Sequence, residues 1–354
     1  MASGSTAGTA AARDGGWPEA QASALCNLGV ALAARGAPAK AAACHREALA
    51  IDQRSGWIAG QATKLGNLGL VSRQMGHLTQ ALDHLGQAGE IDTRTGDRIG
   101  LAYTLASLGR VRHALGSLDA ARADLERALA IGRAAEHSNI CGDALRTLAA
   151  VDRDAGDIRS GSERTGRAAE IAAETGDRAL AADALIVRAS IHHHRGHRPQ
   201  AIDTYRQGLS IAREIRHRYL ETEALIGLAE SGRESTHART ALAVARECGY
   251  RLLEGDALIA LAAVHYHRDS WEQAHEHARQ ALAVCTDTGQ RLSQARAHLV
   301  AAAALRRLGR HPDTEFHHGL ARELFTEIGA PIGDHAQALM GTRDKDPGVI
   351  TARP

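Results

Sequence analysis

Arginines and histidines recur along the sequence at corresponding positions of a repeating helical pattern, so that one groove could collect them. Arginine presents a planar fork of N–H donors that suits carboxylates and phosphates. We therefore predict that this stripe is basic and binds an acidic or phosphorylated segment of a partner. The alternative is that the arginines pair with acids along one margin of the groove, as Asp143 and Arg146 could at i and i+3. The groove positions are Arg73, Arg110, His113, Arg146, Arg153, His193, His194, Tyr266, His267, Arg306 and Arg307, and the margin acids are Asp143, Asp154, Asp183, Glu223 and Asp256.

Three consecutive histidines, His192–His194, are followed closely by His197 and invite a metal-site interpretation. Consecutive residues of a helix point about 100° apart, so the three cannot converge on one ion. His193 and His197 stand at i and i+4, but Gly196 is expected to break the helix between them. The sequence therefore predicts no metal site, and these histidines are expected in the groove or a turn. Groove charge could still change below pH 7.

Motifs that signal catalysis are missing from the sequence. It contains no G-x-x-x-x-G-K-[ST] phosphate loop, no H-E-x-x-H zinc helix and no G-x-S-x-G nucleophile turn. Paired acids such as Asp152 and Asp154 flank turns, as they do on many helical surfaces. We expect a protein that is not an enzyme and has no cofactor.

The elements that must position these residues follow a forty-residue repeat. A mid-repeat glycine recurs at Gly36, Gly76, Gly116, Gly156 and Gly196. Small residues at two fixed positions of the second helix let neighbouring helices approach closely, and an aliphatic position fills the space between repeats. Repeats that cannot bury an apolar face alone must stack, so the sequence predicts an all-α helical solenoid. The expected helix pairs span 18–55, 58–95, 98–135, 138–175, 178–215, 219–248, 252–288 and 292–328.

Glycine and aspartate mark the boundaries between the repeats. Glycine reaches the left-handed conformation without a Cβ clash, so Gly56, Gly96 and Gly176 are expected to end second helices. Asp97 and Asp177 follow directly and suit the capping position of the next helix.

The sixth repeat, 219–251, is irregular because the interval from Gly208 to Ala241 is 33 residues instead of 40. The missing residues amount to about two helical turns, which keeps both apolar faces nearly in phase. The shortened pair could act as a hinge, or the stack could tolerate it as a neutral deletion.

Composition limits the remaining possibilities. Net charge is +1 over 354 residues, which argues against nucleic acid or a membrane surface as a partner. Five single cysteines suit a reducing cytoplasm, and no segment approaches the ~18 apolar residues of a membrane span. The preference for arginine over lysine, with abundant alanine and glycine, suggests a bacterial genome of high GC content. Residues 1–16 are expected to be a disordered leader, 17–330 the solenoid, and 331–354 a mostly disordered C-terminal tail.

The units resemble tetratricopeptide repeats. A glycine or alanine of the first helix falls on Gly29, Gly69, Gly109 and their counterparts, and second-helix alanines fall on Ala41 and Ala48. The family's proline after the second helix is absent. The long repeat with L-G-N-L-G at Leu65–Gly69 is similar to the repeats of kinesin light chains and LGN-type proteins. The T-G-D-R segments Thr95–Arg98 and Thr175–Arg178 and the closing Leu324–Pro331 are similar to the C-terminal arrays of AfsR-type antibiotic regulatory proteins.

This resemblance implies a right-handed superhelical solenoid of about eight helix pairs whose first helices line a concave groove. It also implies that Asn27 and Asn67 clamp the backbone of an extended peptide, although a solvated polar face is equally compatible. The expected function is protein or peptide binding without catalysis, in the regulatory part of a transcriptional regulator of secondary metabolism. The alternatives are a small-ligand sensor that uses the groove, or a biosynthetic-cluster enzyme on this scaffold. Terminal repeats could also form a homo-oligomer through an apolar surface that contains Leu320, Leu324, Phe325 and Ile328.

Overall fold

The computed structural model describes residues 17–341, and every element within that range is a helix. The predicted leader 1–16 lies outside the described residues. The predicted all-α solenoid of about eight helix pairs is confirmed. The helices are α2 (Pro18–Ala34), α3 (Pro38–Ser55), α4 (Ile58–Gln74), α5 (Leu78–Thr95), α6 (Arg98–Ala114), α7 (Leu118–Ala134), α8 (Ser138–Asp154), α9 (Ile158–Thr175), α10 (Arg178–His194), α11 (Arg198–Glu214), α12 (Arg218–Gly232), α13 (Ser235–Cys248), α14 (Arg251–His267), α15 (Trp271–Thr288), α16 (Arg291–Arg307), α17 (His311–Ile328) and α18 (Ile332–Met340).

The even-numbered helices α2 to α16 are the first helices of the pairs and are called A-helices; the odd-numbered α3 to α17 are called B-helices. Gly56, Gly96 and Gly176 adopt φ values of 74°, 74° and 68° and end α3, α5 and α9 in the left-handed conformation. The side chains of Asp97 and Asp177 accept hydrogen bonds from the first-turn amides of α6 and α10. These glycines therefore end B-helices, and these aspartates cap the following A-helices, as predicted.

Small residues allow the two helices of each pair to pack closely. Ala41, Ala81 and Ala121 on the B-helices are fully buried. On α6, a Cβ built on Gly109 would lie 2.5 Å from Cγ of Leu125 on α7, which is too close for any side chain. Glycine at this position is thus required by the neighbouring leucine, which fills the space between the helices.

The shortened sixth pair does not interrupt the core. Tyr205 on α11, Leu225 on α12, Ala241 on α13 and Leu261 on α14 belong to one continuous cluster of buried residues. The non-glycine residue Arg233, with φ of 57°, makes the tight turn between α12 and α13. This continuity favours the neutral deletion over the hinge.

The superhelix turns far enough for its two edges to meet. The phenol of Tyr250, ahead of α14, donates a hydrogen bond of 3.3 Å to the carbonyl oxygen of Ala33 on α2. A Cβ built on Gly76, after α4, would lie 2.7 Å from Cβ of Arg251. Two repeats further along the same contact, a Cβ built on Gly156, after α8, would lie 2.8 Å from Cγ of Pro331. Early and late repeats therefore contact each other.

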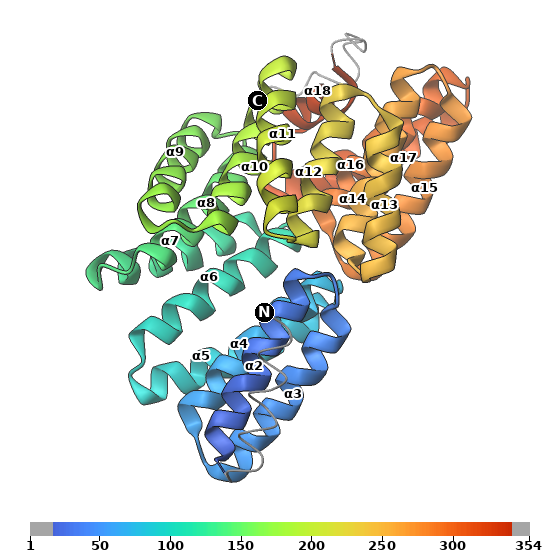
Figure 1. Cartoon of the computed structure of the whole chain (residues 1–354). Helices are drawn as coiled ribbons and strands as arrows, with labels where there is room; N and C mark the ends of the chain where they lie inside the picture. Colours follow the sequence, from blue (N-terminus) through green and yellow to red (C-terminus); the bar gives the residue numbers. More distant parts are fainter. Residues whose placement is uncertain (1–16, 342–354) are drawn as a thin grey trace.

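The predicted disordered tail is wrong for residues 332–340, which form α18. This helix packs against α10, α14, α16 and α17, and it lies between the green and orange helices in Figure 1. Its residues His335, Leu339 and Met340 are buried. Residues 342–354 lie outside the described part of the chain.

The predicted apolar surface on the last pair is largely absent. Phe325 and Ile328 are buried, because the Phe325 ring packs 5.1 Å from the ring of His335 on α18. Leu320 and Leu324 are half-buried. The exposed aromatic residue of α17 is Phe316, whose side chain is 63% exposed. Homo-oligomer formation through this repeat stays a prediction, but Phe325 and Ile328 cannot contribute to the interface because they are buried.

No helix among residues 17–341 combines the length and the apolar composition that crossing a membrane requires.

Candidate functional site

A cavity of about 790 Å³ runs through the centre of the superhelix, and we call it the channel. Its walls come mainly from the A-helices α4 to α16. One position of the repeat contributes a side chain from each of seven successive A-helices, so residues far apart in sequence form adjacent rungs, as the stacking of repeats requires. These rungs are Thr63, Tyr103, Asp143, Asp183, Glu223, Asp256 and Arg296.

The position predicted to clamp a peptide also forms a row. Asn67, Ser107, Thr147, Val187 and Gly227 line the channel at successive A-helices. Asn27 is exposed on α2 and does not line the channel. The amide of Asn67 already donates a hydrogen bond of 3.1 Å to Sγ of Cys26. The clamp role therefore stays a prediction for Asn67, whereas the placement of Asn27 in the groove was wrong.

Eight of the twelve predicted site residues line the channel; these are Asn67, Arg73, Arg110, His113, Arg146, Arg153, His193 and His194. The prediction was wrong for residues of the last two repeats. Tyr266 is buried against Trp271, and the guanidinium of Arg307 lies over the same indole. The His267 ring contacts the carbonyl oxygen of Leu339 at 2.9 Å. Helix α18 packs on this part of the solenoid and takes up the inner surface that the repeat pattern assigned to the groove.

The predicted basic stripe is also wrong, because Arg110, Arg146 and Arg153 are paired with acids. Arg110 and Arg146 both contact Asp143, at 2.8 and 2.9 Å, and Arg146 also contacts Asp183 at 3.2 Å. Burial opposes the charge of Asp143, but Arg110 and Arg146 outweigh it and hold its pKa below the usual value. The alternative pairing at i and i+3 is therefore the observed one.

A second ionic cluster is built around Asp154. Arg153 donates to both carboxylate oxygens at 2.7 Å, and Nε2 of His113 lies 2.7 Å from Oδ2. The same guanidinium donates to Oγ of Ser190 at 2.7 Å. Burial alone would raise the pKa of Asp154, but Arg153 and the hydrogen bond with His113 hold that pKa well below its usual range.

A third cluster joins the late repeats. Arg296 on α16 contacts Glu230 on α12 at 2.7 Å, and Oγ of Ser293 donates to Asp256 at 2.7 Å. Burial raises the pKa of Asp256, although Arg296 and the Ser293 hydrogen bond oppose this effect. Sequence reasoning missed Arg296, which occupies the same repeat position as Asp143 and could have been found by counting.

Glu223 differs from the other channel acids. Within residues 17–341 it accepts no hydrogen bond and forms no ion pair. Burial and the neighbouring Asp183 raise the pKa of Glu223 to about 8, while Arg73 opposes the shift. A carboxyl group in this state is poorly compensated, and a cation placed beside it would be stabilised.

The channel lining as a whole has more acids than bases. Five arginines line it, together with nine carboxylates. Among these acids, Glu223 on α12 and Asp256 on α14 both have raised pKa values. Arg73 on α4 forms no ion pair with a carboxylate among the described residues, and its guanidinium donates to the phenol oxygen of Tyr219 on α12 at 3.3 Å. The channel thus has more acidic than basic groups, and Arg73 lies close to the acids of α12.

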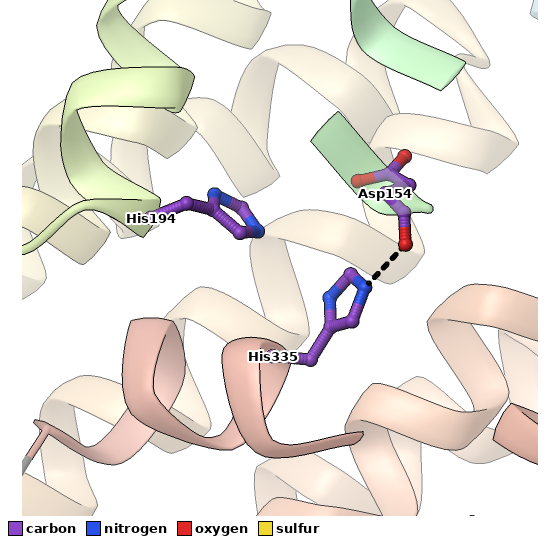
Figure 2. Close-up of side chains that lie close together, drawn as sticks. All are labelled: Asp154, His194 and His335. Atoms are coloured by element: carbon purple, nitrogen blue, oxygen red, sulfur yellow. Dashed lines mark hydrogen bonds between the residues drawn. The ribbon is translucent and has the colours of Figure 1, made fainter. Parts of the chain in front are cut away.

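A group of potential metal ligands lies at one end of the channel. One ligand atom each from Asp154, His194 and His335 lies within 4.8 Å of the others (Figure 2). Sequence reasoning considered His194 only with its neighbours in sequence, whereas its spatial partners come from α8 and α18.

Comparison with known proteins supports the repeat assignment. Residues 60–134 match one tetratricopeptide repeat model, and residues 21–54 and 255–288 match a second. No curated protein matches the sequence.

Solved structures share the fold at low sequence identity. A Rap protein complexed with Competence and Sporulation Factor has 12% identity and a TM-score of 0.61, over 90% of this chain and 94% of that chain. Aspartyl phosphate phosphatase F from Bacillus subtilis has 14% identity and a TM-score of 0.56, over 77% and 71%. The apo form of RapI has 15% identity and a TM-score of 0.50, over 76% and 98%. The repeat matches and the stacked helix pairs together show that this chain is a tetratricopeptide-repeat solenoid.

Proposed function

We propose that the channel binds an extended segment of a protein or peptide and that the chain acts without catalysis. The observation that carries this proposal is the ladder of side chains that successive A-helices present to one enclosed space. Asn67, Ser107 and Thr147 place an amide and two hydroxyl groups at regular intervals along it. The two hydroxyls donate to carbonyl oxygens of their own helices and remain available as acceptors. Such groups suit the evenly spaced N–H and C=O groups of an extended backbone. The similar Rap protein was crystallised in complex with a factor, which agrees with a binding role for this fold.

The charge of the channel changes the partner chemistry that the sequence suggested. Arg110, Arg146 and Arg153 are already paired, so an acidic segment would have to compete with carboxylates that belong to the channel. Glu223 forms no ion pair among the described residues. Burial and the neighbouring Asp183 raise its pKa, and a positive charge beside it would offset both effects. We therefore propose that the segment places a lysine or arginine beside Glu223. Arg73, which contacts Tyr219 on the helix that carries Glu223, is the position that can still accept an acidic or phosphorylated group.

The arrangement of hydroxyl, imidazole and carboxylate groups supports a role without catalysis. His113 and Asp154 form the kind of pair that can activate a nucleophile. The hydroxyl of Ser190, however, donates to the carbonyl oxygen of Val187 and accepts from Arg153. It is held by those two groups and makes no hydrogen bond with His113.

The test uses three pools of fluorescein-labelled hexapeptides that differ only in a central lysine, glutamine or phosphoserine. We expect the lysine pool to give the highest fluorescence anisotropy with the full chain. Glu223→Gln should weaken this binding about tenfold or more, because a hydrogen bond to a charged group contributes ~1.5–3 kcal/mol. Glu174→Gln, an exposed acid on α9, is the matched control and should leave binding unchanged. Equal binding by all three pools, or an equal effect of the two variants, would contradict the proposal.

A small-ligand sensor is the second candidate, and the size of the channel favours it. A volume of about 790 Å³ falls within the roughly 300–1,000 Å³ typical of ligand pockets. A cationic metabolite could bind beside Glu223, and the anionic group of a zwitterionic one could also pair with Arg73. A thermal-shift screen with amino acids and polyamines tests this function, since a ligand selective for the folded state raises the melting temperature.

Because the sequence resembles AfsR-type arrays, the chain could act in regulation whether it binds a peptide or a small ligand. We propose that this chain serves as the ligand-binding part of a transcriptional regulator. The test is affinity purification from the native host, where a DNA-binding regulator should be recovered with the wild-type chain and lost with Glu223→Gln.

A further inference from the structure

Two histidines and one aspartate from three separate helices meet where α18 packs against the end of the channel. Asp154 ends α8, His194 ends α10, and His335 lies in α18 (Figure 2). Their potential ligand atoms lie within 4.8 Å of one another, and the two imidazole rings are nearly perpendicular, with centroids 5.5 Å apart. Asp154 and His335 are buried, and His194 is half-buried.

The hydrogen bonds of each histidine leave one nitrogen available. Nδ1 of His194 donates to the carbonyl oxygen of Ser190 at 3.0 Å, so Nε2 carries the lone pair. Nε2 of His335 donates to the carbonyl oxygen of Asp154 at 3.1 Å, so Nδ1 carries the lone pair. Both of these nitrogens are buried and have no hydrogen-bond partner. A histidine whose other nitrogen donates to a backbone carbonyl is the usual arrangement of a metal ligand.

The carboxylate of Asp154 retains capacity for a third ligand. Oδ2 accepts from Arg153 and from His113, whereas Oδ1 accepts from Arg153 alone. Each carboxylate oxygen offers two lone pairs, so Oδ1 keeps one free. Hydrogen-bonded carboxylates of this kind are common among metal ligands.

We propose that His194, His335 and Asp154 bind a first-row divalent cation such as Zn²⁺, which fastens α18 to α8 and α10. Imidazole nitrogens suit zinc, nickel, copper and iron, and Arg153 neutralises the single carboxylate, which disfavours calcium and magnesium. Burial keeps the pKa values of both histidines below their usual range, so the neutral form that metals require is present at neutral pH.

The geometry needs only a small adjustment to hold the ion. Ligand atoms around a tetrahedral zinc ion with bonds of ~2.0–2.2 Å lie roughly 3.4 Å apart. The three atoms, which lie up to 4.8 Å apart, must therefore approach by up to about 1.4 Å, which a rotation of the His194 ring together with a shift of the nine-residue α18 can supply. Asp154 and His194 line the channel, which gives the ion an entry path and leaves a fourth coordination position toward the channel.

The first experiment measures binding of Co²⁺ and Zn²⁺ to the full untagged chain after treatment with EDTA. We expect one equivalent of Co²⁺ with the visible absorption of a four- or five-coordinate ion, and displacement of Co²⁺ by Zn²⁺. His335→Gln and His194→Gln should each weaken Zn²⁺ binding at least tenfold. The matched control is His298→Gln, because His298 and His317 form a separate histidine pair on α16 and α17. Its affinity should equal that of the wild type.

A second measurement follows α18 itself and keeps the proposal testable if one variant loses this helix. Zn²⁺ should slow hydrogen exchange in residues 332–340 of the wild-type chain but not of His194→Gln, in which α18 is unchanged in sequence. Circular dichroism in EDTA checks that each variant is folded. The proposal is overturned if the wild-type chain binds no Co²⁺, if the His298 variant loses binding instead, or if Zn²⁺ binds without protecting α18.

Discussion

The guanidinium of Arg73 on α4 donates a hydrogen bond of 3.3 Å to the phenol oxygen of Tyr219 on α12 and lies 5.3 Å from the centroid of that ring. The two residues are 146 positions apart in the chain. Their contact joins the second and sixth helix pairs, so that early and late repeats meet at the channel. The same contact places Arg73 near Glu223, whose charge it partly compensates.

Removing this phenol hydroxyl tests the contact across the channel. Tyr219→Phe should lower the free energy of unfolding by about 0.5–1.5 kcal/mol, the usual contribution of one hydrogen bond. The ring remains, so its packing against Tyr250 is kept. Urea denaturation followed by circular dichroism measures the change. Tyr103→Phe, at a half-exposed ring on α6, is the control and should stay within 0.5 kcal/mol of wild type.

Glu223 should make stability depend on pH in a defined direction. Its pKa of about 8 in the folded state exceeds the ordinary glutamate value, so the folded chain holds a proton that the unfolded chain has released. Its contribution is therefore fully present below pH ~4.5 and is lost as pH rises through about 8. Glu223→Gln should remove this dependence and raise the free energy of unfolding at pH 9, where wild-type Glu223 is charged. The expected gain is on the order of 2 kcal/mol, smaller than the whole pKa shift implies, because the carboxyl group is partly exposed to solvent. Melting temperatures between pH 5 and 9 measure it, and parallel curves for the two proteins would contradict the assignment.

Two glycine substitutions separate packing from helix propensity. Gly109→Ala should destabilise the chain by about 1–3 kcal/mol, because its Cβ would overlap Leu125. Gly86→Ala lies on an exposed face of α5 with no atom within 4 Å of the new Cβ. It should stabilise the chain by up to ~1 kcal/mol, since alanine favours the helix. The measurement is the urea midpoint of each variant, and the same sign for both would contradict this account.

The buried pair of Lys64 and Asp52 joins α4 to α3 at 3.0 Å, and both side chains are almost completely buried. Lys64→Met should cost roughly 3–5 kcal/mol, because it leaves a buried carboxylate without its counter-charge. The double variant Lys64→Met with Asp52→Leu should recover most of that loss, since two apolar groups replace the pair. Thermal unfolding at neutral pH measures both. A double variant as unstable as the single one would show that packing around Trp57, whose ring Lys64 covers, dominates instead.

The sequence predicted the repeat, the helix bounds and the side of each helix that faces the channel, because these features are local. Gly56 and Gly96 end helices through their own backbone freedom, and Asp97 caps α6 through bonds to the next turn. Stacking with a constant period then carries one repeat position, such as that of Asp143 and Asp183, along the same wall. Eight of the twelve predicted groove residues line the channel for this reason.

The sequence alone could not predict which charges meet or where the groove ends. Arg110 pairs with Asp143 in the next A-helix, and this depends on how far long side chains reach between rungs. Tyr266 and Arg307 lie against Trp271 of α15 instead of in the channel, and His267 contacts α18. Contacts of this kind depend on the rotation of each helix pair relative to the previous one, and these rotations add up over several pairs.

By itself, the sequence determined a stacked all-α solenoid and the row of side chains that each A-helix turns inward, since period and capping act within one or two repeats. Only the tertiary structure decided that Tyr250 closes onto Ala33, that Tyr219 meets Arg73, and that His335 reaches His194 and Asp154. Small rotations between neighbouring repeats accumulate into the superhelical turn, and that sum brings together residues that no local pattern relates.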